Sequence, residues 1–322
     1  MVANEPRTDC DKLLNPTTRR ILKHRRRREV LIHSVAGGLL PERRASNGFL
    51  EIDDCNINLS DSIAIRISSD TRPHNLMLAG LQKGLRIVYK GREIVGEGIG
   101  FGVPILLYSD DTYFSGTSKL YLDDRKDVHV IRKEFLFDRV QRKVMHGIKM
   151  QNAKLRQLWR YLDRLYQNHR SLQPVSSADV LGKLGVHLQF SETDAAGKVI
   201  AAYSVSHDRI RAKMDFFPTR ESNLKGVFVL NEQGSEFFRR YSDSNGTELV
   251  DKEIGAWGIV EAESARVTDL RGRVGFQLAR SRGSVLHRGR EYTSGLADWV
   301  GLDYEIDPAK RTFEYEIQVL GA

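Results

Sequence analysis

The chain has only two cysteines, Cys10 and Cys55, among its 322 residues. Two thiols cannot build a disulfide framework, and this composition suits a reducing compartment. No run of about 18 apolar residues is present, so the sequence predicts no membrane-spanning helix. The nearest candidate, residues 30–40, is short and is not followed by a small-residue cleavage site. Together these absences predict a cytoplasmic protein.

Motifs for common cofactor and nucleophile chemistry are also missing. The nine histidines are scattered, without an H-E-x-x-H pair that would place two metal ligands on one helix face. No G-x-S-x-G nucleophile elbow occurs. The glycine run at 96–102 does not satisfy G-x-G-x-x-G, because Phe101 or Val103 falls where the third glycine is required. The sequence therefore predicts neither a cofactor nor a metal ion, while leaving open a site assembled from distant segments.

The positive charge is concentrated in two segments. The net charge is +8, yet residues 1–44 hold eleven Lys and Arg against five Asp and Glu, and residues 121–170 hold thirteen against six. The densest cations are Arg19, Arg20, Lys23, Arg25, Arg26, Arg27 and Arg28. Such a cluster can contact the phosphates of a nucleic acid or bind an acidic partner. The alternative is a solvated helix face, since the segment lacks the aromatic side chains that stack on bases.

A glycine stands at every second position from Gly96 to Gly102. In a strand, successive side chains point to opposite faces, so these glycines would leave one face bare. Bare backbone is typical of a place where a flat or bulky group approaches closely. That group could be a sugar ring, an aromatic side chain or another part of the backbone.

The rest of the chain favours a mainly β fold. From Phe49 onward apolar residues alternate with polar ones, and Lys90-Gly91 predicts a hairpin turn between residues 85–89 and 93–95. Further strands are expected at 184–190, 198–206, 209–216, 225–231, 256–263, 273–280, 300–306 and 312–319. We expect one large antiparallel β-sandwich or two adjoining sandwiches, in the manner of a supersandwich.

Two helices are expected beside the strands. A basic helix is predicted from about Thr18 to Ile32, and an apolar stripe from Leu155 to Tyr166 predicts a connecting helix. The chain then divides into a basic segment at 1–45, a β region at 46–150, the connecting helix at 151–174 and a second β region at 175–322.

Carboxylates and aromatic residues near the glycine strand favour a carbohydrate ligand. Sugar chemistry commonly needs two carboxylates, and sugar rings stack on aromatic side chains. The candidate catalytic residues are Glu97, Asp111, Asp298 and Asp303, and the candidate binding residues are Gly98, Gly100, Tyr108, Tyr113 and Trp299. We expect Glu97 or Asp111 to approach Asp298 or Asp303 across one groove. The competing interpretation is that each group serves its own turn or the core.

Two segments carry a family resemblance. Residues 90–104, continuing to Tyr113-Phe114-Ser115, look like an uncharacterised prokaryotic β-sandwich family of archaeal type. Residues 299–304 and 313–317 resemble strands of galactose-mutarotase-like supersandwiches. The resemblance implies a supersandwich fold and a carbohydrate ligand. The paired histidines of aldose epimerases are not evident, so epimerase activity is not implied.

Overall fold

The structure is a computed structural model that describes residues 32–33, 49–69, 82–95, 99–123, 130–144, 187–293 and 297–322. Its described part consists almost entirely of strands, with two short 3₁₀ helices, η3 (Glu221–Asn223) and η4 (Asp251–Ile254). None of its helices is long and apolar enough to cross a membrane. The expected basic and connecting helices lie outside the described residues, except that Ile32 begins a strand.

The strands of the first half are β1 (Ile32–His33), β2 (Phe49–Ile52), β3 (Asp54–Asn58), β4 (Ile63–Ser68), β5 (Arg86–Tyr89), β6 (Arg92–Glu93), β7 (Gly100–Tyr108), β8 (Thr112–Phe114), β9 (Thr117–Asp123) and β10 (Val130–Val144). Those of the second half are β11 (His187–Ser206), β12 (Arg209–Pro218), β13 (Leu224–Gly234), β14 (Arg240–Asp243), β15 (Glu248–Val250), β16 (Gly258–Ile259), β17 (Ser264–Thr268), β18 (Gly275–Ala279), β19 (Ser284–Thr293), β20 (Ala297–Ile306) and β21 (Thr312–Leu320).

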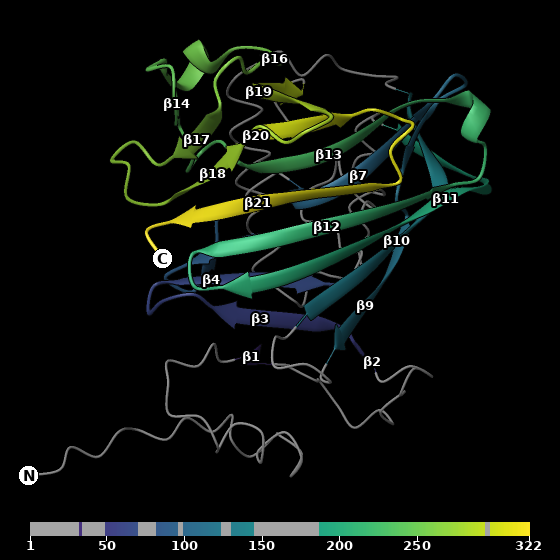
Figure 1. Ribbon diagram of the computed structural model, residues 1–322, viewed down its shortest axis with the longest axis horizontal. Helices are drawn as coiled ribbons and strands as arrows, with labels where there is room; N and C mark the ends of the chain where they lie inside the picture. Colours follow the sequence, from purple (N-terminus) through teal and green to yellow (C-terminus); the bar gives the residue numbers. More distant parts are fainter. Residues whose placement is uncertain are drawn as a thin grey trace, which may run out of the picture.

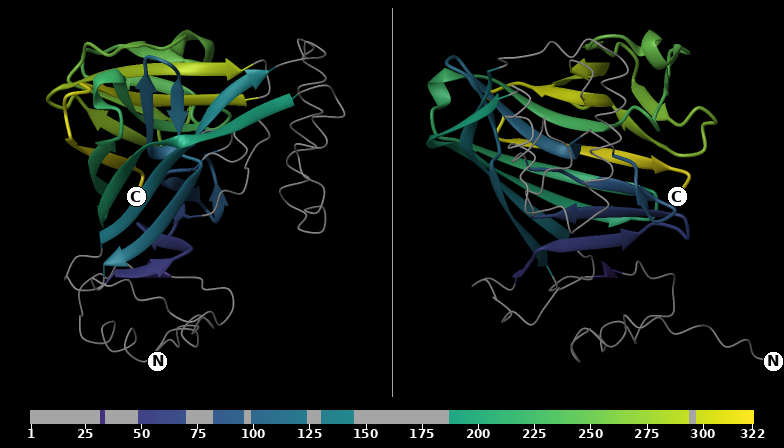
Figure 2. Two further views of the ribbon diagram at one scale, coloured as in Figure 1. Left: turned by 90° about the vertical axis from the view of Figure 1, so that its right-hand side faces the viewer. Right: turned by 180° about the vertical axis from the view of Figure 1, so that it is seen from behind.

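These strands form two antiparallel sheets (Figure 1). The small sheet has five strands in the order β1-β3-β4-β5-β6. The large one has sixteen strands, with the path β15-β14-β17-β18-β21-β12-β11-β10-β8-β7-β13-β20-β19-β16, with β9 beside β10 and β2 beside β9. Figure 2 shows that the large sheet is strongly curved, with β3 and β4 of the small sheet next to its β9 and β10 side. The prediction of a mainly antiparallel β protein is confirmed.

Alternating burial explains why the central strands form. In β12, Ile210, Ala212 and Met214 are buried while Arg209 and Arg211 are exposed. β21 pairs with β12 and alternates in the same way. Each fully buried Ile or Phe contributes roughly 1.5–3 kcal/mol relative to exposure. The alternation therefore holds one face of this sheet on the core.

The glycine strand differs from its predicted form. Gly96 to Gly98 lie outside the described residues, and Gly100 and Gly102 have φ angles of 90° and 73°. These values belong to the left-handed region, so the simple extended alternation is wrong at these two residues. The register between β7 and β13 shifts between Leu230 and Asn231, which places a β-bulge at Gly102.

The predicted close approach at the glycines is confirmed, and the approaching groups belong to the chain itself. A Cβ on Gly100 would lie 2.6 Å from the carbonyl oxygen of Leu85. One on Gly102 would lie 2.5 Å from the hydroxyl oxygen of Tyr203. The bare backbone at these positions therefore serves internal packing.

The side chain of Asn231 holds the bulge in place. Its Oδ1 accepts hydrogen bonds from the backbone N–H of Gly102, at 3.1 Å, and from the hydroxyl of Tyr315, at 3.0 Å. Its Nδ2 donates to the carbonyl of Leu302 at 3.0 Å. The Asn231 backbone N–H donates to Oδ1 of Asp303 at 2.7 Å. One buried residue thus connects β7, β20 and β21.

The contacts that join the small sheet to the large one include a β-bridge and a buried ammonium group. Leu85 and Phe101 form an isolated β-bridge, with N–H to O distances of 3.0 and 2.8 Å. The buried Lys133 of β10 donates from Nζ to the carbonyls of Ser68, at 2.7 Å, and Lys83, at 2.5 Å. Because buried carbonyls and ammonium groups need partners, these bonds fix the relative position of the sheets.

We expect Gly100→Ala to destabilise the fold more than Gly246→Ala does. Both glycines have similar φ angles, 90° and 86°, but a Cβ at Gly246 has no neighbour within 4 Å in the described ranges. The left-handed conformation alone costs roughly 1–2 kcal/mol for a residue with a Cβ. Overpacking against Leu85 should add about 1–3 kcal/mol at Gly100. Urea unfolding of both variants measures the difference, and equal losses would contradict the close-approach argument.

Candidate functional site

Two predicted aromatic residues, Tyr108 and Tyr113, belong to a cluster that also contains Asp110 and Arg220. The Tyr108 and Tyr113 rings meet edge to face, with centroids 5.3 Å apart. The guanidinium carbon of Arg220 lies 4.6 Å from the Tyr108 centroid and 5.1 Å from that of Tyr113. Arg220 also donates to Oδ2 of Asp110 at 2.7 Å. The hairpin turn between β7 and β8 positions three of these residues, and the segment after β12 brings the fourth.

This tyrosine cluster is closed by the chain's own groups. Both rings are buried, and the Tyr108 hydroxyl donates to the carbonyl of Ala196 at 2.5 Å. The hydrogen bond from Arg220 lowers the pKa of Asp110, and burial raises the pKa of Tyr108. The ring faces that could stack on a sugar are thus partly covered by Arg220. Asp111 serves the same turn, since its Oδ1 accepts from the N–H of Thr112.

Asp303 and Trp299 lie on another part of the molecule, in β20. Asp303 is 5% exposed and accepts the backbone hydrogen bond from Asn231. Trp299 is 8% exposed, and its indole Nε1 has no hydrogen-bond partner among the described residues. Asp298 pairs with Tyr292 through the backbone, but its side chain lies outside the described part, as do Glu97 and Gly98.

Asp111 and Asp303 are not neighbours. Asp111 accepts the backbone hydrogen bond of Tyr108, which pairs with Leu224 at the start of β13. The register of β20 places Asp303 opposite Leu230, between the pairs Val229–Tyr304 and Glu232–Gly301. Six residues of strand span roughly 20 Å, at about 3.3 Å per residue. This exceeds the separation of roughly 5–9.5 Å between the carboxyl groups of glycosidases, so we do not combine the two residues in one site.

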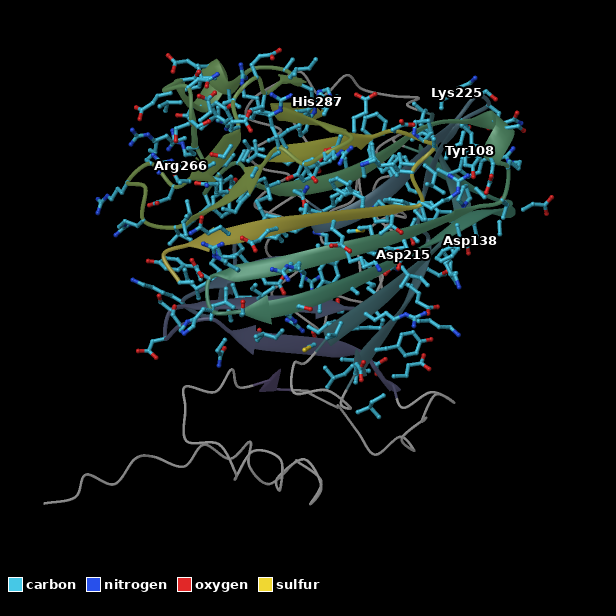
Figure 3. All side chains as sticks on the ribbon, viewed as in Figure 1. Tyr108, Asp138, Asp215, Lys225, Arg266 and His287 are labelled. Atoms are coloured by element: carbon cyan, nitrogen blue, oxygen red, sulfur yellow. The ribbon has the colours of Figure 1, made fainter. Side chains whose placement is uncertain are left out.

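A third place combines an aromatic ring, a bare glycine and polar side chains on the outer face of β16, β19 and β20. Leu286 of β19 is buried, whereas Val285 before it is 39% exposed. His287 therefore shares the outward face with Val285, and Glu305 of β20 lies opposite Val285. Nε2 of His287 is 3.0 Å from Oε2 of Glu305. Figure 3 shows His287 well away from Tyr108.

Trp257 covers the glycine of this outer face. A Cβ built on Gly289 would lie 2.6 Å from Cδ2 and 2.8 Å from Cε3 of Trp257. The indole thus occupies the space directly over Gly289, which pairs with Gly301 of β20. Trp257 remains partly exposed, and the neighbouring Ile259 is 57% exposed. We call Trp257, Ile259, Gly289, His287 and Glu305 the Trp257 face.

The Trp257 face presents an aromatic ring beside an imidazole and a carboxylate. Gly289, which Trp257 covers, and His287 are two residues apart on β19, so their Cα atoms lie about 7 Å apart along the strand. This spacing suits a ligand with an apolar ring face and peripheral hydroxyl groups. Within the described ranges, no group of three or more His, Cys, Asp or Glu side chains could hold a metal ion.

Sequence reasoning did not single out Trp257, His287 or Glu305. Residues 256–263 were expected to form a full strand, but only Gly258–Ile259 pair, as the short edge strand β16. The available signal was a tryptophan between Gly255 and Gly258. Its partner Gly289 is 32 residues away in the sequence and becomes visible only through the β16–β19 pairing.

Comparisons with known proteins add little to this geometry. No family model matches the chain, and no curated protein matches it. The crystal structure of the Slr1438 protein from Synechocystis sp. PCC 6803 is similar, with 8% sequence identity and a TM-score of 0.36. The similarity covers 89% of this chain and 100% of that one. A similarity this weak supports no conclusion about function.

Arg220→Gln should raise the pKa of Asp110 toward the ordinary aspartate value. Arg220 favours the ionised form, so its stabilising effect is present above the unfolded-state pKa and is lost as the pH falls through the lowered folded-state pKa. Side-chain carboxyl NMR titration measures this shift. The control is Asp251, whose pKa is lowered by Arg239 and should not change in the same variant. An unchanged Asp110 titration would show that Arg220 does not bind the carboxylate.

Proposed function

We propose that the protein binds a carbohydrate on the Trp257 face. The observation that carries this proposal is the partly exposed indole lying over Gly289, on the same strand face as the His287–Glu305 pair. The indole supplies a flat apolar surface, and the imidazole and carboxylate supply hydrogen bonds to hydroxyl groups. The proposed ligand is a carbohydrate, as expected from the sequence. The proposed binding site, however, lies on β16, β19 and β20 and not at the glycine strand.

The proposal concerns binding and not a reaction. The Asp303 carboxylate lies beside this face, opposite His287, but it is buried and accepts the backbone hydrogen bond of Asn231. A carboxylate held in this way maintains the β13–β20 contact and is poorly placed to attack or protonate a sugar. The resemblance to galactose-mutarotase-like supersandwiches supports the same ligand class as part of this proposal.

Trp257→Ala should weaken binding of the glycan that the wild-type protein selects on a glycan array. Truncating an aromatic anchor commonly costs about 2 kcal/mol, or roughly 30-fold in Kd. Trp257→Phe should retain part of the affinity, since it keeps a ring over Gly289. Isothermal titration calorimetry measures the affinities, and thermal unfolding verifies that each variant is folded.

The matched control is Phe217→Ala. Phe217 is also an exposed aromatic residue, 50% accessible, but it stands at the end of β12 beside Lys198. Its removal should leave glycan affinity unchanged. Wild-type affinity in folded Trp257→Ala would reject the Trp257 face as the site, and an array without any bound glycan would reject the carbohydrate function.

We propose a second, separate activity for the basic N-terminal segment, namely binding of nucleic acid. Its support is the excess of cations in residues 1–44, with four consecutive arginines at 25–28. Those arginines lie outside the described residues. The proposal therefore rests on charge alone, and salt dependence is its natural test.

Replacing Arg25 to Arg28 with glutamine should weaken DNA binding and flatten its salt dependence. Each lost phosphate contact lowers the slope of log K against log salt by about 0.9, so four contacts would change it by about 4. The variant keeps β1, which pairs with β3 and would be removed by a longer deletion. Arg271→Gln combined with Arg282→Gln, at exposed positions, is the charge control. An unchanged slope would eliminate this role.

A further inference from the structure

Unpartnered polar atoms gather where β13 ends. Gln233 and Ser235 are both fully buried, with an exposed fraction of 0%. Within the part of the chain that the structure describes, neither Nε2 nor Oε1 of Gln233 has a hydrogen-bond partner, and neither has Oγ of Ser235. Buried side-chain amides and hydroxyls are normally bonded, so three such atoms within three residues require an explanation.

The residues around these atoms are mostly apolar. Gln233 pairs with Val300, whose side chain is buried, on the interior face of the sheet. The carbonyl of Gly234 accepts hydrogen bonds from the N–H groups of Phe237, at 3.1 Å, and Phe238, at 3.0 Å, so the chain turns here and brings two phenylalanines close. Exchanging the nitrogen and oxygen of the Gln233 amide would not help, because both atoms lack a partner.

The three atoms match the bonding capacity of one water molecule. Internal waters typically make about three hydrogen bonds to buried polar groups that are otherwise unsatisfied. The Gln233 amide supplies a donor and an acceptor, and the Ser235 hydroxyl supplies either. Residues two apart in the chain have Cα atoms no more than about 7 Å apart whether the chain is extended or turns, and a bridging oxygen can span this distance.

We propose that Gln233 and Ser235 bind an ordered internal water molecule. The water bridges the last residue but one of β13 to the turn that follows it. Trp299 is not part of this site, since it pairs with Gly234 and so faces the opposite side of the sheet from Gln233. The water site is independent of the proposed glycan site on the Trp257 face.

A crystal structure at about 1.5 Å or better, with NOEs between water and the Gln233 side-chain amide, tests the proposal directly. The expected result is one water peak within hydrogen-bond distance of Gln233 and Ser235, with NOEs typical of a long-lived water. A peak-free site with an unpartnered amide, or an amide bonded to protein atoms only, would overturn it.

A double-mutant cycle provides a second measurement in solution. Gln233→Met and Ser235→Ala each remove a partner of the same water, so their effects on the urea midpoint should be non-additive. The control cycle combines Gln233→Met with Ser115→Ala. Ser115 is also buried, but its hydroxyl already donates to the carbonyl of Thr117 at 2.8 Å. Additivity in both cycles would contradict a shared water, and non-additivity in the first alone would support it.

Discussion

The carboxamide of Asn231 is the interaction on which much of the large sheet depends. A regular antiparallel ladder would join Asn231 to Leu302 through backbone groups. Here the Asn231 side chain donates to the Leu302 carbonyl, and the backbone N–H of Asn231 donates to the Asp303 carboxylate. The same side chain accepts from Gly102, so the bulge in β7 is held from β13. Because the bonds made by this amide are buried, removing it would leave several polar groups unsatisfied, at a cost of about 1–3 kcal/mol each.

The bulge in turn determines how the two sheets meet. The left-handed conformations of Gly100 and Gly102 let β7 pass close to Leu85 and Tyr203 without a steric clash. This approach allows the bridge between Leu85 and Phe101 that begins the contact with the small sheet. A strand of regular pitch would carry a Cβ into one of these neighbours. The repeated glycines are thus explained by backbone geometry and internal packing, at least for the two that the structure describes.

Periodic burial is what the sequence reveals best: it predicts β12 and β21, which each have one face on the core. β13 and β20 are also predicted, although most of their described residues are buried. It also predicts the turn at Lys90-Gly91, where both residues have positive φ. It does not predict β14, β15, β17 or β19. The first three are short and lie near the edge of the sheet, where alternation has little length to develop. The proximity of Tyr108 and Tyr113 could be predicted from the sequence because a hairpin turn joins them. The position of Arg220 could not be predicted, because only the fold of the chain after β12 brings Arg220 onto the two rings.

Glycines that are covered by another group have different roles in different parts of the large sheet. At Gly100 and Gly102 the space is filled by groups that are themselves buried, so no outside molecule can share the contact. At Gly289 the space is filled by an indole that keeps part of its surface in solvent. A partly exposed aromatic ring beside a histidine and a carboxylate is the surface on which we propose that a ligand binds. The proposed binding surface therefore rests on the exposure of the covering group, and not on the glycine itself.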